Sequence, residues 1–406
     1  MNSTTLPSFA LPAHAPAAAR AVLKPLERLR HGCLELRLPD GSVRRFGHGE
    51  PHAHLQLRNW NVFQAALARG DVGLAETYVA GDWTCASLPD LIGLFVRNRQ
   101  EIERLVYGSW LGRLAGRLRH LLNRNSRAGS RRNISAHYDL GNSFYRLWLD
   151  ETMNYSAAWF DGRPDQSLSQ AQDAKVLRAL TMAGVAPASR VLEIGCGWGA
   201  LAEMAARDLG AHVTGVTLSQ EQLDYAQQRV ARAGLADRTD LRLQDYRDID
   251  DAPFDAICSI EMVEAVGREW WPRYFATVAR LLKPGGRACI QTIVIDDALW
   301  DRYITGSDFI QQYIFPGGCL PSRREFERHA AAAGLRVVDA FAFGADYALT
   351  LRLWRERFLA QRTAVLALGH DEKFVRLWEF YLAYCEAAFT HRNTDVVQYT
   401  LVRDAS

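Results

Sequence analysis

The fold is decided by the stretch Val191-Leu192-Glu193-Ile194-Gly195-Cys196-Gly197-Trp198-Gly199, which a helical pattern follows directly. Its apolar start predicts a buried strand, and its glycines predict a tight turn that a ligand can approach closely. In a doubly wound sheet such a turn lies at the carboxyl end of a strand, where cofactors bind. The spacing GxGxG differs from the dinucleotide fingerprint GxGxxG, and no lysine follows that would grip a phosphate. We therefore predict a cofactor site on Gly195, Gly197 and Gly199, with Glu193 beside it; a tight turn without a ligand is the alternative.

Further strand signals follow this turn along the chain. Apolar or β-branched runs occur at 211–218, 255–260, 287–295, 335–343 and 396–402. Helical patterns separate them, including a long helical insertion between the last two. Alternation of strands and helices predicts a mostly parallel sheet that is covered by helices on both faces. The expected fold class is α/β, a Rossmann-like doubly wound sheet.

The chain has 406 residues, enough for two or three domains. Residues 1–19 contain several Pro and Ala and no Lys or Arg, which predicts a disordered tail and not a secretory signal. Residues 20–110 mix short strand and helix patterns and predict a small α+β domain. Residues 133–406 carry the alternation of strands and helices and form the expected catalytic domain.

Residues 111–132 form a basic bridge between these regions, with seven arginines and no acidic residue. Leucines recur beside the arginines at helical spacing. One interpretation is a solvated linker helix. The other is a basic amphipathic segment that meets anionic lipid headgroups, which would make the small domain lipid-associated.

Composition excludes several classes of protein. Apolar residues make up 48% and charged residues 23% of the chain, as in soluble globular proteins. The net charge of +2 is too small for binding to nucleic acid by bulk charge alone. No apolar run reaches the 18 or so residues that a membrane-spanning helix needs. Seven widely spaced cysteines without a CxxC pair argue against a disulfide framework or a zinc site, so no metal is expected and a reducing cytoplasm fits best.

Several motifs in a fixed order give the chain a specific resemblance. They are His137-Tyr138-Asp139-Leu140-Gly141-Asn142, Met153-Asn154-Tyr155-Ser156, the glycine turn, Thr217-Leu218-Ser219, Ser259-Ile260-Glu261-Met262-Val263-Glu264 and Tyr347-Ala348-Leu349-Thr350-Leu351. With these motifs the chain resembles the cyclopropane-fatty-acyl-phospholipid synthases and the related mycolic acid methyltransferases, which have the class I S-adenosylmethionine-dependent methyltransferase fold. The resemblance covers nearly everything after residue 20, including motifs at 73–78 and 81–83 in the small domain.

The resemblance implies S-adenosylmethionine as the cofactor and places a set of residues around it. The set is Tyr155, Ser156, Glu193, Gly195, Gly197, Gly199, Thr217, Gln222 and Tyr246. Tyr155 and Ser156 would close over the sulfonium end. Thr217 and Gln222 would hold the ribose. Tyr246 stands where the family usually has a tryptophan against the adenine, and it keeps an aromatic face there; ordinary strand and loop roles are the alternatives for Thr217 and Tyr246.

The family's reaction implies a second set of residues. The cis double bond of an acyl chain attacks the sulfonium methyl, and a bound bicarbonate ion removes a proton from the resulting carbocation. The resemblance assigns this anion to the side chains of Glu264, Tyr347 and Gln291 and to the backbone N–H groups of Ala157 and Ile260. Aromatic faces and a carboxylate would stabilise the cation, and water must be excluded from it.

The chain departs from the family pattern at this second set. Ala157 replaces a common cysteine, and Gln291 and Ala265 replace histidines. Glutamine can donate a hydrogen bond to an anion but cannot carry a proton. The departures indicate a divergent branch that binds its base differently. They also leave open a methyl- or methylene-branched product, or a lipid-binding relative without catalysis.

Two further features have competing interpretations. Cys385 matches a cysteine that is often marked as an active-site residue, but a cysteine in an apolar helix is usually a small hydrophobic residue. The aromatic stretch 308–318 is interpreted as a wall or lid over the acyl groove, with ordinary core packing as the alternative.

The expected function is therefore the formation of cyclopropane rings on unsaturated acyl chains of membrane phospholipids, with S-adenosylmethionine as cofactor and bicarbonate as a second ligand. The expected location is the cytoplasm, peripherally at the inner membrane surface. No nucleic acid partner is expected, and a homodimer is an open alternative to a monomer.

Overall fold

A computed structural model describes residues 15–102 and 140–404. The chain divides into two compact units, Met1–Ala115 and Gly116–Ser406, which are described separately. The basic bridge expected at 111–132 lies outside the described residues. Of the tail expected at 1–19, only the last residues are described. They belong to helix α1 (Ala17–Leu26), in which Ala19 is fully buried, so order begins earlier than the sequence indicated.

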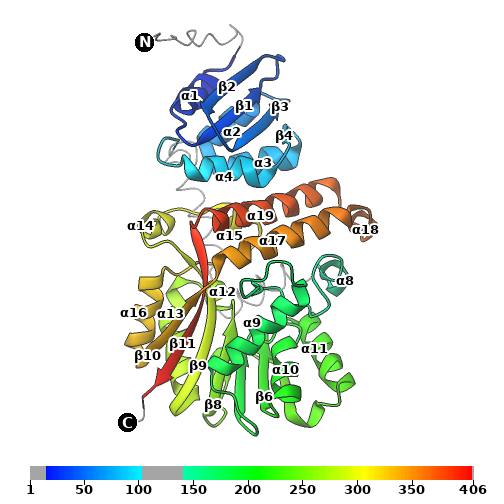
Figure 1. Cartoon of the computed structure of the whole chain (residues 1–406), viewed down its shortest axis with the longest axis vertical. Helices are drawn as coiled ribbons and strands as arrows, with labels where there is room; N and C mark the ends of the chain where they lie inside the picture. Colours follow the sequence, from blue (N-terminus) through cyan, green and yellow to red (C-terminus); the bar gives the residue numbers. More distant parts are fainter. Residues whose placement is uncertain (1–14, 103–139, 405–406) are drawn as a thin grey trace. The chain divides into compact units, whose positions relative to one another are not determined.

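The N-terminal unit combines a small sheet with helices, which confirms the expected α+β class (Figure 1). Its strands are β1 (Gly32–Arg37), β2 (Val43–His48), β3 (His52–Leu57) and β4 (Trp83–Cys85), in the sheet order β2-β1-β3-β4. Strand β1 runs antiparallel to β2 and parallel to β3. The helices that follow α1 are α2 (Asn61–Arg69), α3 (Asp71–Ala80) and α4 (Leu88–Arg97).

The motifs at 73–83 serve the core of this unit. A Cβ atom on Gly73 would lie 2.1 Å from the carbonyl oxygen of Ala65, so only glycine lets α3 pack this closely on α2. Trp83 is fully buried, and its Nε1–H donates to Thr77 Oγ1 and to the carbonyl of Leu74, both at 3.1 Å. These residues account for the motifs by packing, with no ligand required.

The second unit contains a seven-stranded sheet in the order β10-β11-β9-β8-β5-β6-β7 (Figure 1). Its strands are β5 (Arg190–Ile194), β6 (His212–Thr217), β7 (Thr239–Leu243), β8 (Phe254–Ile260), β9 (Leu282–Ile295), β10 (Leu335–Ala342) and β11 (Thr394–Arg403). Strands β7, β6, β5, β8 and β9 pair with one another in parallel. Strand β11 pairs antiparallel with both β9 and β10. The arrangement confirms the expected α/β doubly wound sheet.

Helices cover both faces of this sheet and create two hydrophobic cores. Helices α9 (Leu168–Met182), α10 (Ala200–Asp208) and α11 (Gln220–Arg232) supply one core, and α13 (Trp271–Leu281) and α16 (Arg323–Ala332) supply the other. Adjacent residues of β5 divide between them: Val191 belongs to the first core and Leu192 to the second. Burial on both faces is why β5 has adjacent apolar residues and not an alternation of apolar and polar ones.

The remaining helices lie at the ends of the strands. They are α8 (Asn142–Tyr145), α12 (Val263–Val266), α14 (Trp300–Tyr303), α15 (Phe309–Tyr313), α17 (Gly344–Ala360), α18 (Arg362–Ala367) and α19 (Glu372–Thr390), with short 3-10 turns at Ala236–Arg238, Tyr246–Asp248 and Arg268–Trp270. The expected helical insertion thus consists of α17, α18 and α19, and α17 packs along α19 (Figure 1). In the described part of the chain no helix is both long and apolar enough to cross a membrane. All seven cysteines are free thiols.

Candidate functional site

The glycine turn connects β5 to α10, and its three glycines serve different purposes. All have positive φ angles, of 86° at Gly195, 50° at Gly197 and 82° at Gly199. A Cβ on Gly199 would lie 2.9 Å from the Cβ of Ala226, so this glycine allows α10 to approach α11. A Cβ on Gly197 would meet no atom within 4 Å. Gly197 therefore keeps the space beside the turn open, as a closely approaching ligand needs.

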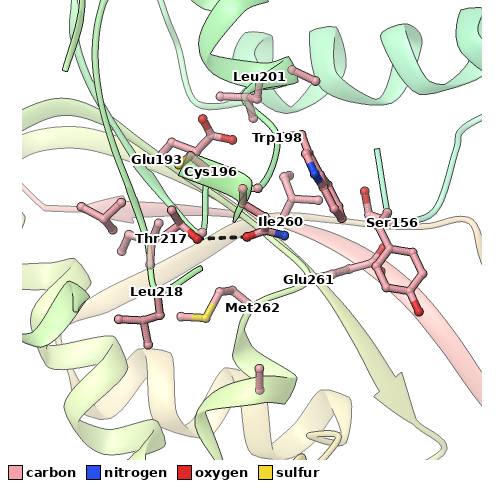
Figure 2. A pocket seen from close by; sticks show the side chains of 18 of the residues that line it. Ser156, Glu193, Cys196, Trp198, Leu201, Thr217, Leu218, Ile260, Glu261 and Met262 are labelled. Carbon is pink, nitrogen blue, oxygen red and sulfur yellow. Dashed lines mark hydrogen bonds between the residues drawn. The ribbon is translucent and has the colours of Figure 1, made fainter. Parts of the chain in front are cut away.

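A cavity adjoins the turn (Figure 2). It is enclosed by residues 153–156, by the turn, and by the carboxyl ends of β6 and β8. The predicted site residues that line it are Tyr155, Ser156, Glu193, Gly195, Gly197, Thr217, Gln222, Tyr246 and Ile260. The carboxyl ends of parallel strands meet at one edge of a sheet, which explains why these distant residues converge.

Several polar groups in this cavity are available to a ligand. The hydroxyl of Thr217 donates to Oε1 of Gln222 at 3.0 Å, and both side chains are buried. Among the described residues, the buried hydroxyl of Tyr246 and the Oε2 atom of Glu193 have no hydrogen-bond partner. Burial raises the pKa of Tyr246 to about 12 and that of Glu193 to about 8. Buried polar atoms usually have hydrogen-bond partners, so these two oxygens fit a ligand with polar groups. The ring of Tyr246 fits an aromatic ring of such a ligand.

Lys175 is a buried cation that the sequence analysis missed. Its Nζ lies 2.5 Å from Ser156 Oγ, and its side chain is fully buried in α9. Burial lowers the pKa of Lys175 to about 8, although the nearby carboxyls of Glu261, Asp150 and Glu193 oppose this shift. Charged residues are rarely buried completely, and nothing in the local pattern of α9 distinguishes this lysine from its solvent-facing neighbours.

Glu261 lies in the cavity lining just after β8 (Figure 2). Three donors hold its carboxylate. Its Oε1 atom accepts from the backbone N–H of Ala157 at 2.8 Å and from Nε2 of Gln291 at 2.7 Å. Its Oε2 atom accepts from the hydroxyl of Tyr347 at 2.7 Å. Three of the groups assigned to bicarbonate by resemblance therefore contact a carboxylate of the chain itself.

Opposing effects set the acidity of this carboxyl. Burial raises the pKa of Glu261, and the Ala157 N–H, the Lys175 charge, and the Tyr347 and Gln291 hydrogen bonds oppose the rise. Burial also raises the pKa of Tyr347 well above its ordinary value, so the phenol keeps its proton and acts as a donor.

Glu264 lies elsewhere, on the short helix α12. One of its carboxylate oxygens accepts from the backbone N–H of Ile293. The other is buried and lacks a hydrogen-bond partner in the described part of the chain. Burial, reinforced by the charge of Glu261, raises the pKa of Glu264 to about 8. Among the described hydrogen bonds, those of Tyr347 and Gln291 go to Glu261 and not to Glu264.

The amide of Gln291 is oriented by a chain of polar contacts that leads away from the cavity. Nε2 of Gln398 donates to Oε1 of Gln291 at 3.0 Å. Arg178 donates in turn to Oε1 of Gln398 at 2.7 Å and pairs with Asp339 at 3.0 Å. Because Oε1 of Gln291 is already an acceptor, its NH2 group faces Glu261 as a donor.

Several aromatic rings lie close to Tyr155. Its hydroxyl lies 2.7 Å from the hydroxyl of Tyr381 on α19, and its ring centroid lies 5.5 Å from that of Trp354 and 6.5 Å from that of Phe315. Phe315 belongs to the aromatic stretch 308–318. That stretch thus borders the cavity residue Tyr155 and also packs on α19, consistent with a wall.

Cys385 lies on α19 and outside the cavity lining. Burial raises the pKa of its thiol, so the neutral form is favoured. A neutral thiol is a weak nucleophile, which favours a packing role for Cys385. Among the described residues no cluster of three or more His, Cys, Asp or Glu side chains suits a metal ion.

Comparisons with known proteins agree with this geometry. The family model for mycolic acid cyclopropane synthetases matches residues 125–399. The chain is 41% identical over 398 residues to tuberculostearic acid methyltransferase UfaA1 of Mycobacterium tuberculosis, covering 96% of this chain and 92% of the relative. It is 36% identical over 356 residues to the cyclopropane-fatty-acyl-phospholipid synthase of Escherichia coli K12, covering 88% and 89%. The crystal structure of mycolic acid cyclopropane synthase CmaA1 complexed with SAH and CTAB superposes with a TM-score of 0.63 at 34% identity, covering 67% of this chain and 97% of that one.

Proposed function

Because the chain belongs to the mycolic acid cyclopropane synthetase family, we propose that it uses S-adenosylmethionine to methylate the cis double bond of an unsaturated phospholipid acyl chain and close a cyclopropane ring. One observation carries the proposal. The lining of the cavity at the glycine turn includes Tyr155, whose ring packs against other aromatic rings, and Glu261, whose carboxylate is hydrogen-bonded. This combination suits a reaction in which positive charge develops on carbon.

The cavity residues fit S-adenosylmethionine. The open space at Gly197 admits the ligand's closest approach to the backbone, and the unpartnered oxygens of Glu193 and Tyr246 can be satisfied by it. Thr217 and Gln222 offer a hydroxyl and an amide for the ribose hydroxyls. When bound, the cofactor supplies an electrophilic methyl group on a positively charged sulfur.

The chain's own residues then have to stabilise and deprotonate a cation. The π electrons of the double bond form the new C–CH3 bond, and the neighbouring carbon becomes positive. The ring of Tyr155 and the carboxylate of Glu261 can stabilise that charge. Loss of a proton from the new methyl carbon frees the C–H electron pair to form the third bond of the ring. The buried rings beside Tyr155, including Trp354, exclude water that would trap the cation.

A methyl-branched or methylene-branched product is a second candidate. The observation that favours it is the 41% identity to a relative named tuberculostearic acid methyltransferase. The same cation leads to a methylene branch if a hydride shifts between the two former alkene carbons, since proton loss from the methyl group then leaves a C=CH2 double bond. A saturated methyl branch requires a later reduction of that bond by a separate hydride donor. The two candidates differ only after the methyl transfer.

We propose that the lipid is reached at a membrane surface. The support is the basic leucine-containing segment 111–132, which has the composition of a surface-binding amphipathic segment.

Isotope-labelled methyl transfer tests the function. The protein is incubated with S-adenosylmethionine carrying a trideuterated methyl group and with vesicles of dioleoyl phospholipid, and the released fatty acids are analysed by mass spectrometry. Vesicles of fully saturated phospholipid are the control. We expect a deuterated product only from the unsaturated lipid. Catalytic hydrogenation under conditions that spare cyclopropanes then distinguishes a ring from a methylene branch. Absence of label in the lipid would contradict the proposal.

A further inference from the structure

We propose that Glu261 is the base of the reaction and occupies the place that the family fills with bicarbonate, so that this protein needs no external anion. The proposal rests on the proposed function and deepens it. Glu261 is a catalytic residue in this assignment because it lines the cavity at the glycine turn, where the cofactor is proposed to bind.

The three donors that could hold an anion here are already hydrogen-bonded to the carboxylate of Glu261. The donors are the Ala157 N–H, Nε2 of Gln291 and the Tyr347 hydroxyl, at 2.8, 2.7 and 2.7 Å. An additional bicarbonate would have to share these donors with a carboxylate, and two adjacent buried anions strongly disfavour each other. One anion fits here, and the chain supplies it.

The departures from the family pattern meet at this carboxylate. Ala157 offers only its backbone N–H, which is the group that Glu261 uses. Gln291 donates a hydrogen bond where the best-known relatives have a histidine, and it can neither accept a proton nor carry a charge. Lys175, Tyr347 and Glu264 are the other titratable groups that interact with Glu261. The first is a cation, the second is a phenol with a raised pKa, and the third is a carboxyl whose pKa is raised to about 8, so at neutral pH it already holds its proton. Glu261 is therefore the group among these that can take up a proton at neutral pH.

The backbone at Glu261 supports a functional role. Its φ angle is +50°, in the left-handed region that non-glycine residues rarely adopt. Such a conformation is disfavoured for residues with a Cβ. The backbone N–H of Glu261 donates to the carbonyl of Gln291 at 2.8 Å and holds it there. Strained non-glycine residues concentrate at functional sites, and this one lies in the cavity lining.

The proton transfer balances without any other reactant. A carboxylate oxygen of Glu261 forms an O–H bond with a hydrogen of the new methyl group. The C–H electron pair stays on carbon and closes the ring, which removes the positive charge from the acyl chain. Glu261 becomes neutral and later returns its proton to solvent. Burial raises the pKa of this carboxyl and so makes it more basic than an exposed glutamate.

Two substitutions of Glu261 test the proposal, with exposed Glu327→Gln as the matched control. Glu261→Gln keeps the shape and the hydrogen-bonding capacity but removes the base. Glu261→Gly removes the side chain, suits the positive φ angle, and opens the anion space between the same three donors. Each variant is compared with the native protein for cofactor affinity by calorimetry, for thermal unfolding, and for label transfer to vesicles with and without added bicarbonate.

Binding of bicarbonate itself is measured separately, by broadening of the 13C NMR signal of labelled bicarbonate. This measurement does not depend on turnover. We expect broadening with Glu261→Gly and none with the native protein or with Glu327→Gln.

In the activity assay we expect the native rate to be unchanged in bicarbonate-depleted buffer. Glu261→Gln should lose about a hundredfold or more of the rate while its cofactor affinity stays within about twofold. Glu261→Gly should be similarly slow and should regain at least about tenfold with added bicarbonate, a rescue that a purely structural role of Glu261 would not produce.

The proposal is overturned if the native protein binds bicarbonate or depends on it, or if Glu261→Gln turns over at the native rate. A native protein that labels no lipid would contradict the proposed function, and the NMR comparison would still decide whether the anion site is filled by Glu261. Loss of cofactor binding in both variants would contradict a role confined to proton transfer.

Discussion

Substitution of Gly197 separates the binding of the cofactor from the stability of the fold. A Cβ at this position would meet no atom within 4 Å, so the folded chain has room for a side chain. The φ angle of +50° is disfavoured for residues with a Cβ by roughly 1–2 kcal/mol. For a unit of this size we therefore expect Gly197→Ala and Gly197→Val to lower Tm by only a few degrees.

The same side chains would fill the space that the cofactor needs. Overpacking a close contact by one or a few carbon atoms is unfavourable by about 1–3 kcal/mol, which corresponds to roughly a tenfold to a hundredfold loss of affinity. We expect Gly197→Ala to lose about tenfold and Gly197→Val about a hundredfold or more in affinity for S-adenosylmethionine.

Gly199→Ala is the matched control, because its Cβ would lie 2.9 Å from Ala226 and force α10 away from α11. It should lower Tm more than Gly197→Ala, while the cofactor affinity of the remaining folded protein falls less. Calorimetric titration and thermal unfolding by circular dichroism measure both quantities. Native affinity in Gly197→Val would refute the placement of the cofactor at this turn.

Three further outcomes follow from the buried charges and the basic segment. The pKa of Glu264 is raised from 4.5 to about 8, so its contribution to folding is complete below pH 4.5 and is lost as pH rises toward 8. Across that interval the unfolding free energy of Glu264→Gln should rise relative to that of the native protein by up to ~1.4 kcal/mol per pH unit. A difference that chemical denaturation finds to be independent of pH would contradict this. Tyr347→Phe removes one donor to Glu261, so the pKa of Glu261 should rise further and the acidic limb of the kcat profile should move to higher pH. The loss of rate should be smaller than in Glu261→Gln. Replacement of three basic residues by Gln should weaken sedimentation with anionic vesicles at low salt, with a smaller difference at high salt, and unchanged sedimentation would argue against a membrane role. Those residues are Arg113, Arg117 and Arg119.

Local patterns were sufficient to predict the sheet and the cofactor turn. The expected strand before the glycine turn matches β5 because apolar residues point to both faces of the sheet and the glycines end the strand sharply. Strand β9 begins at Leu282, earlier than the expected 287. The intervening Pro284-Gly285-Gly286 is a turn signal, and pairing of Leu282 with Phe254 of β8 overrides it.

The site around Glu261 could not be predicted in this way. Its partners Ala157, Gln291 and Tyr347 are 104, 30 and 86 residues away along the chain, so no local spacing relates them. The sequence offered two glutamates three positions apart after β8, and the resemblance selected Glu264. Glu261 lines the cavity and Glu264 does not. The left-handed backbone at Glu261 gives no signal in the sequence, because the residue is not a glycine.

The buried charges explain how a base can stay ionised in an apolar site until it is needed. Glu193 and Glu261 share Lys175 as a buried counter-ion with Asp150, and burial raises the pKa of all three carboxyl groups. A cationic cofactor in the same cavity favours the ionised form of Glu193 and Glu261. After methyl transfer the positive charge is on the acyl carbon, still close to Glu261, so the carboxylate keeps a counter-charge until it accepts the proton. Uptake of that proton removes the cation and the carboxylate charge in one step, which leaves a neutral product in an environment that disfavours unpaired charge.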